Sequence, residues 1–213
     1  MTIRILALVS DCYGVGGGIV RYNQDLFEPL AGEAEIVVLP RYGTTKGASP
    51  PPSVTQLPAI AGRIAYSLAA IRLAWSRRPF DIVFCGHPFI APLAWVIARL
   101  LGARFWIQGH GTDIVSDRRA IVRQAIEAAD MVSTVSRGTR TSLLEWADVP
   151  LHRARVLPDA VRLHGVPLQR EVGRDLGVHV VEEVGAVGRG DALGALHGGR
   201  DLHFHLRQQL LLL

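Results

Sequence analysis

The chain has 213 residues, of which 49% are hydrophobic, with a formal charge of +4 and a pI of about 9.6. This length and apolar content are enough for a sizeable buried core, and no apolar run is long and uncharged enough to predict a membrane span. The N-terminus lacks the pattern of a secretory signal, and two cysteines, Cys12 and Cys85, make neither a disulfide framework nor a metal cluster. We therefore expect a reduced, cytoplasmic protein.

Nearly all of the positive charge is arginine, since Lys46 is the only lysine. The basic residues are scattered and lack the aromatic interleaving of an RNA-binding strand, so nucleic acid is not an expected partner. A basic surface is compatible with anionic nucleotides, and also with peripheral contact at the inner face of a membrane.

The first segment predicts a strand, a glycine loop and a helix. An apolar run, Ile3–Val9, precedes Gly16, Gly17 and Gly18, and an apolar-periodic segment follows over residues 19–30. Glycines before a helix N-terminus favour an anion site, because backbone N–H groups there are free and no Cβ atom obstructs them. The loop is neither a Walker loop nor a G-x-G-x-x-G motif, so a flexible turn is the alternative interpretation.

Strands and helices alternate along the rest of the chain, which predicts right-handed βαβ units and a doubly wound parallel α/β sheet of Rossmann-like type. In the helix expected at 59–77, apolar residues such as Ile64, Leu68 and Trp75 recur at helical spacing, Gly102 is placed to end a helix, and Ser136 is placed to cap one. Strands are predicted at 35–40, 54–57, 81–85, 104–108, 131–135 and 155–157, and further helices at 88–101, 118–129 and 137–146.

His110 is the leading candidate for a functional side chain. It follows the predicted strand 104–108, lies between Gly109 and Gly111, and precedes Asp113 by three residues. Ligands of parallel sheets bind at the carboxyl ends of strands, where a histidine can bond a sugar hydroxyl or a phosphate, or exchange a proton. The alternative is that Asp113 merely caps the next helix; we favour function, because both glycines would leave space for a ligand.

Two further residues are weaker candidates. His87 follows the predicted strand 81–85 in the same manner as His110, although Pro88 beside it is typical of a helix start. Arg21 lies one turn into the first helix, where it could meet a phosphate, and an ordinary exposed helical arginine is the alternative.

Five segments occur in an order that resembles the N-terminal domain of the GT4 (group 1) glycosyltransferases, over about residues 3–161. They are GGI at 17–19 with RYNQDL at 21–26, FCGH at 84–87, QGHGTD at 108–113, ADMVSTVSR at 129–137 and RVLPDAV at 155–161. The resemblance implies the N-terminal half of a GT-B fold, in which two Rossmann-like domains face each other across a cleft.

The resemblance also implies a function. Members transfer a hexose from a nucleotide-sugar donor to a hydroxyl acceptor, a sugar or lipid-linked glycan, with retention of configuration and without a metal or other cofactor. Gly17 and Gly18 correspond to the loop that approaches the donor diphosphate. His110 corresponds to the histidine near the transferred sugar, Asp113 to the acidic position after it, and Ser136 to the serine that ends the sixth strand.

The chain departs from this family at its C-terminal end. Asp159 stands where the family usually has asparagine, and the E-x7-E carboxylates expected after residue 161 are missing. We predict an acceptor-side domain over 1–161 and an atypical, poorly ordered tail over 162–213, interpreted as the result of truncation or a frameshift. We accordingly expect little or no transferase activity from this chain alone.

Two other functions remain open. One is a non-catalytic module that binds a glycan or a lipid-linked acceptor. The other is a Rossmann-type NAD(P) oxidoreductase, which is disfavoured because Leu39-Pro40 stands where an acidic residue would end the second strand.

Overall fold

A computed structural model of the chain describes residues 2–43, 47–111, 113–114 and 118–158. Asp159 and the predicted tail over 162–213 lie outside the described residues. The strands are β1 (Ile3–Val9), β2 (Ala34–Pro40), β3 (Val54–Gln56), β4 (Ile82–Cys85), β5 (Arg104–Gly109), β6 (Met131–Thr134) and β7 (Ala154–Val156). The helices are α1 (Gly18–Leu30), α2 (Arg63–Ser76), the 3₁₀ helix η1 (Pro88–Ile90), α3 (Ala91–Leu101), α5 (Ala120–Glu127) and α6 (Arg137–Leu144).

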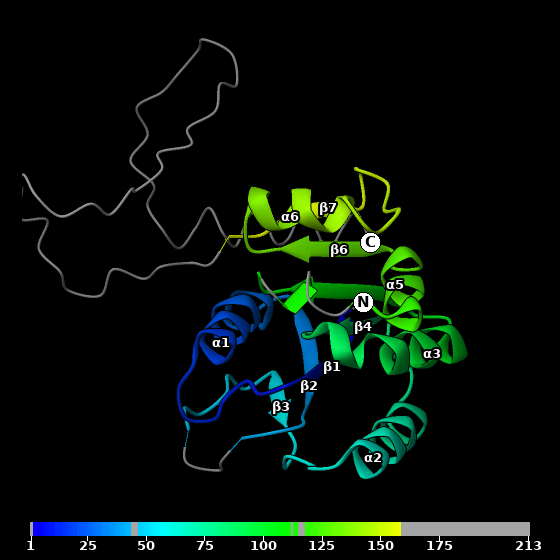
Figure 1. Cartoon of the computed structure of the whole chain (residues 1–213). Coiled ribbons are helices and arrows are strands. Elements are labelled where there is room, and N and C mark those ends of the chain that lie inside the picture. The colour runs from blue at the N-terminus through cyan, green and yellow to red at the C-terminus, as the bar shows by residue number, and fades with distance from the viewer. Residues whose placement is uncertain (1, 44–46, 112, 115–117, 159–213) are drawn as a thin grey trace, which may run out of the picture.

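The strands form one parallel sheet in the order β3-β2-β1-β4-β5-β6-β7 (Figure 1). The chain runs outward from β1 to β3 and then returns to the other side of β1 at β4, so the strand order reverses between β1 and β4. In doubly wound sheets this reversal opens a crevice at the carboxyl ends of the strands. The predicted fold class is confirmed.

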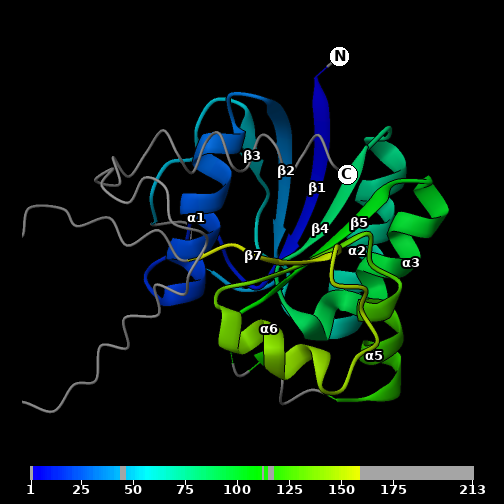
Figure 2. The same cartoon turned by 90° about the horizontal axis from the view of Figure 1, so that it is seen from above.

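Helices cover both faces of the sheet (Figure 2), with α1 on one side and α2, α3 and α5 on the other. This double cover explains why β1 is a nearly continuous apolar run. Its side chains alternate between two buried clusters, with Ile5 under α1 and Leu6 on the opposite face. Under α1, Phe84 makes edge contacts with Phe27 at 5.2 Å and with Trp106 at 4.8 Å between ring centroids.

The element boundaries follow the sequence signals closely. Gly102 ends α3 in the left-handed conformation at φ 65°, and Ser136 Oγ accepts the backbone N–H of Thr139 as the N-cap of α6. The helix predicted at 88–101 is divided, because His87 caps a short 3₁₀ turn before α3 begins.

The helix predicted at 59–77 is present as α2, but the apolar set that revealed it faces outward. Ile64, Leu68, Ile71 and Trp75 are 78%, 64%, 42% and 59% exposed. The buried face of α2 carries Tyr66, Ala70, Leu73 and Ala74 instead, where two alanines allow the helix to lie close to its neighbours.

Candidate functional site

Three neighbouring strands, β1, β4 and β5, end at the same edge of the sheet, since all are parallel. The segments that follow them are the glycine loop before α1, Gly86-His87, and the His110 loop. The predicted site residues of these three loops are therefore brought to the carboxyl end of the sheet where the strand order reverses.

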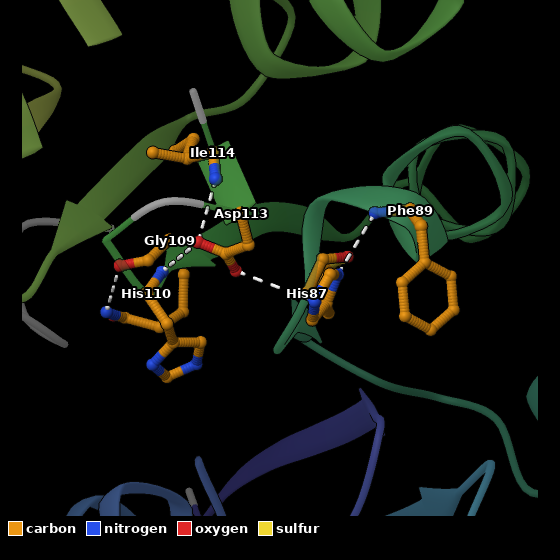
Figure 3. Close-up of polar contacts among 8 residues, drawn as sticks. His87, Phe89, Gly109, His110, Asp113 and Ile114 are labelled. Carbon is orange, nitrogen blue, oxygen red and sulfur yellow. Dashed lines mark hydrogen bonds and ion pairs between the residues drawn. The ribbon is translucent and has the colours of Figure 1, made fainter. Parts of the chain in front are cut away.

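Asp113 organises the loop after β5. Its Oδ1 atom accepts backbone N–H groups from His110 at 2.8 Å and from Ile114 at 2.7 Å. Its Oδ2 atom lies 3.7 Å from His87 Nε2, so that one carboxylate joins the loops after β4 and β5 (Figure 3). The Asp113 side chain is only 12% exposed, which strengthens these interactions relative to the same contacts in water.

His87 is held on both sides of its ring. Nδ1 accepts the backbone N–H of Phe89 at 3.4 Å, which caps η1, while Nε2 points toward Asp113 (Figure 3). The helix start expected at Pro88 is thus present, and the His87 side chain that caps it is also 21% exposed.

His110 is uncharged at neutral pH. Burial lowers the pKa of its imidazole from 6.5 to about 4; the nearby Asp113 charge and a hydrogen bond with the Gly86 backbone oppose the shift, and His87 adds to it. Its Nε2 atom is buried and lacks a hydrogen-bond partner in the described part of the chain. A buried polar atom without a partner is uncommon and marks a place that a bound group can satisfy.

Tyr22 connects α1 to the His110 loop. Its ring meets the His110 ring edge-on at 4.8 Å between centroids, and its hydroxyl donates to the Leu157 carbonyl at 3.2 Å. Tyr22 lies one helical turn after Gly18, so this contact places the beginning of α1 beside His110. Sequence reasoning did not select this residue as part of the site.

The two glycines beside His110 differ in their surroundings, and one of them does not have the predicted role. A Cβ atom on Gly109 would lie 3.0 Å from Ile114 Cβ, so Gly109 makes room for Ile114 and not for a ligand. Gly111 has φ +68°, which a residue with a Cβ atom rarely adopts, and it is needed for the turn itself. The expectation that both glycines clear a ligand space is therefore wrong for Gly109.

Gly17 and Gly18 form an exposed start to α1. Gly17 has φ +111°, makes no side-chain cap, and accepts the first helical hydrogen bond from Arg21 N at 3.1 Å. The first N–H groups of a helix, which precede the one donated by Arg21 here, have no intrahelical partner. A Cβ atom at either glycine would meet nothing within 4 Å. An anion can therefore approach this helix end closely, while the assignment of a donor phosphate to it remains a prediction.

The glycine loop is anchored by polar groups that sequence reasoning missed. Asp11 Oδ1 accepts the N–H groups of Cys12 at 2.7 Å and Gly14 at 3.2 Å. From α1, Asn23 Nδ2 donates to the Asp11 carbonyl and Gln24 Nε2 to the Cys12 carbonyl. Helical spacing could have identified these two residues, because Asn23 and Gln24 lie three and four residues after buried Val20 and therefore on the core-facing side of α1.

The remaining predicted residues have structural partners. Arg21 is half-exposed and pairs with Asp25 one turn later at 3.4 Å, while Ser136 caps α6 through Thr139. The Arg21 contact matches its alternative interpretation and the Ser136 contact confirms the predicted cap, while the roles of both residues in substrate binding stay predictions.

Beneath the His110 loop, β5 and β6 share a buried polar network. Trp106 Nε1 donates to Ser133 Oγ at 2.6 Å, and Ser133 Oγ donates to Gln108 Oε1. Gln108 Nε2 in turn donates to the Gly109 carbonyl at 3.1 Å. This network fixes the end of β5 from which the His110 loop departs.

Within the ranges described above, no set of three histidine, cysteine or acidic residues is grouped as a metal site would require. None of the helices described there has the length and apolar character needed to cross a bilayer.

Comparison with known sequences adds a family. The sequence profile of Glycosyltransferase Family 4 matches residues 16–164, which is most of the chain. A search of curated proteins finds no match.

Solved structures with a similar fold include sucrose-phosphate synthase from Thermosynechococcus elongatus, with a TM-score of 0.54, 15% identity, and coverage of 73% of this chain and 48% of that one. The Anabaena protein HepE in complex with UDP-glucose has a TM-score of 0.51 and 9% identity, with coverage of 73% and 43%. The apo form of the lipopolysaccharide outer core galactosyltransferase WaaB has a TM-score of 0.51 and 14% identity, with coverage of 79% and 50%. The chain thus corresponds to about half the length of these proteins.

Proposed function

The chain belongs to glycosyltransferase family 4, and on that premise we propose that it is the acceptor-side half of a retaining, metal-independent transferase. The complete enzyme would move a hexose from a nucleotide sugar to a hydroxyl group of a sugar or lipid-linked acceptor. That HepE binds UDP-glucose supports a nucleotide-sugar donor for this chain as well.

The observation that carries the proposal is the meeting of His87, Asp113 and His110 beside the beginning of α1. Asp113 links the two histidine loops, and Tyr22 links His110 to α1. One end of the sheet thereby offers a neutral imidazole for a sugar hydroxyl and a helix N-terminus for a phosphate.

In the proposed reaction, the unpartnered Nε2 atom of His110 bonds a hydroxyl of the transferring sugar. Its low pKa keeps the ring neutral, so it can hold a hydroxyl without adding a positive charge next to the sugar. The free amides at Gly17 and Gly18 face the donor diphosphate and stabilise the negative charge that develops on the leaving nucleotide.

A nucleotide-release assay tests this function. The chain is incubated with UDP-, GDP- and ADP-sugars and a panel of hydroxyl acceptors. We expect release no faster than in a matched His110→Asn variant, because one wall of the site alone does not complete the donor pocket. Binding of the donor sugar by calorimetry is expected to weaken in the variant; robust release by the chain alone, or donor-sugar binding that is identical in both proteins, would contradict the proposal.

We further propose that α2 rests on an anionic membrane surface, which fits a lipid-linked acceptor. Surface helices that expose apolar and aromatic side chains beside arginines bind membrane interfaces in this way. The Arg78 guanidinium stacks 4.1 Å from the centroid of Trp75, and between Glu35 and Asp81 the sequence contains no acidic residue. The outward face carries four exposed apolar residues, Ile64, Leu68, Ile71 and Trp75.

A further inference from the structure

A groove of about 640 Å³ opens between the loop after β2, the beginning of α2, η1 with α3, and the segment before α5. Among its lining residues, all of them described, three are arginines, namely Arg41, Arg63 and Arg119, and none is acidic. The other lining residues include aromatic and aliphatic side chains, Tyr42, Phe89 and Leu93 among them. The groove therefore combines excess positive charge with apolar walls.

We propose that this groove binds the phosphate or carboxylate group of an anionic acceptor, with the acceptor's apolar part against Phe89 and Leu93. The identification of the ligand as the acceptor rests on the proposed transferase function. The binding of an anion does not, because it follows from the groove itself.

Arg41 is the central residue of this site. Its guanidinium lies 5.1 Å from the centroid of Tyr42 and 4.8 Å from that of Phe89, and these stacked contacts orient its planar fork. Its Nε atom is buried and has no hydrogen-bond partner among the described residues. A buried, oriented guanidinium donor is suited to bidentate binding of a phosphate or carboxylate.

Arg63 supplies a second charge from another element. It is the first residue of α2 after Gly62, where the helix dipole also favours an anion. Tyr66, one turn later in the groove wall, is fixed by a 2.9 Å hydrogen bond from its hydroxyl to the Leu39 carbonyl. The positive groups of the groove thus come from the loop after β2 and from α2, and the wall between them is held in place.

The groove adjoins the candidate site through Phe89. The same ring that stacks on Arg41 lies 4.4 Å, between centroids, from the ring of His87. His87 in turn faces Asp113. A ligand anchored at Arg41 and packed on Phe89 therefore has its far end directed toward the His87 side of the Phe89 ring, where the proposed function requires an acceptor hydroxyl.

Calorimetric titration with phenyl phosphate tests the site, since this probe carries both a phosphate and an apolar ring. We expect saturable binding that weakens about tenfold or more in Arg41→Gln and at least threefold in Arg63→Gln. Arg72→Gln is the matched control, because Arg72 is an exposed arginine on α2 that does not line the groove. Arg63 is exposed, so its substitution tests the site even if Arg41→Gln impairs folding.

Absence of saturable binding, or an equal loss in Arg72→Gln, would overturn the proposal. Phosphatidylcholine vesicles with and without phosphatidic acid then identify the source of the anion. Competition by phosphatidic acid that depends on Arg41 indicates a lipid-borne phosphate, and its absence indicates a soluble anion; either result supports the site. Failure of the transferase function would leave Arg41-dependent binding of phenyl phosphate intact, so the two proposals fail separately.

Discussion

Asp113 joins two histidines with its two oxygens: Oδ2 lies 3.7 Å from His87 Nε2, and Oδ1 accepts the backbone N–H of His110. The carboxylate is therefore both a structural acceptor for the loop and a negative charge that acts on both imidazoles. Substitutions of Asp113 are expected to change both the free energy of unfolding and the pKa of His110.

Asp113→Asn is predicted to lower the pKa of His110 further, because the Asp113 charge is the larger of the two interactions that raise this pKa against burial. Unfolding free energy is expected to fall by roughly 1–2 kcal/mol as the Oδ1 hydrogen bonds lose their charge. NMR titration of the imidazole and urea unfolding measure the two effects. Asp81→Asn is the control, because Asp81 also accepts a backbone N–H group, from Arg4 at 2.8 Å, but lies at the opposite end of the strands. An equal change in the pKa of His110 in this variant would contradict the local explanation.

Stability is predicted to depend on the titration of His110. Because its folded pKa of about 4 lies below the ordinary value of 6.5, the unfolded chain takes up the proton first as the pH falls. The stability that comes from burying His110 as a neutral imidazole is fully present above pH 6.5. As the pH falls from 6.5 to 4, the free energy of unfolding decreases by roughly 1.4 kcal/mol per pH unit.

Urea unfolding across this pH range measures the effect. His110→Asn is expected to flatten the slope relative to the parent protein, while His152→Asn, at an exposed position, leaves it unchanged. Parallel pH profiles for the parent and His110→Asn would show that the imidazole is not buried in its neutral form.

Most of the fold was predictable because both faces of the sheet are covered. Buried parallel strands such as β1 are continuous apolar runs, and Gly102 and Ser136 end or begin helices through local chemistry that needs no tertiary contact. Periodicity identified α2 for the same local reason. It could not tell which face is buried, because Ala70 and Ala74 pack closely while the larger Leu68 and Trp75 remain outside.

The candidate site was predictable only in part. Position after a strand was sufficient to select His87, His110 and Asp113, whereas their mutual contacts depend on the order of β4 and β5 in the sheet. The role of Gly109 could not be inferred, since its neighbour Ile114 returns to it only through the folded turn. Tyr22 was missed for a related reason, because its partner belongs to another loop.

Gly109→Ala is predicted to destabilise the protein by about 1–3 kcal/mol, because the added methyl group would overlap the Ile114 side chain. Thermal or urea unfolding gives the size of the loss. The double variant Gly109→Ala with Ile114→Ala is expected to recover part of it, since the overlapping atoms are removed. Strict additivity of the two single changes would mean that the glycine serves another purpose.

Tyr22→Phe is predicted to cost roughly 1 kcal/mol of unfolding free energy, because it leaves the Leu157 carbonyl without the tyrosine hydroxyl. The ring contact with His110 is retained, so the His110 titration curve should be unchanged. Tyr22→Leu removes the ring as well and is expected to expose the imidazole and raise its pKa toward 6.5. An unaltered titration in Tyr22→Leu would show that Tyr22 does not contribute to the burial of His110.

Replacing the exposed apolar residues of α2 is predicted to reduce membrane binding without reducing stability. Leu68→Ser and Trp75→Ser remove side chains that are 64% and 59% exposed, so the free energy of unfolding should change by no more than about 0.5 kcal/mol. Co-sedimentation with vesicles rich in phosphatidylglycerol should fall several-fold for the double variant. Leu151→Ser is the matched control, because Leu151 is 70% exposed but lies before β7. Equal loss of binding in the control would refute α2 as the membrane-facing element.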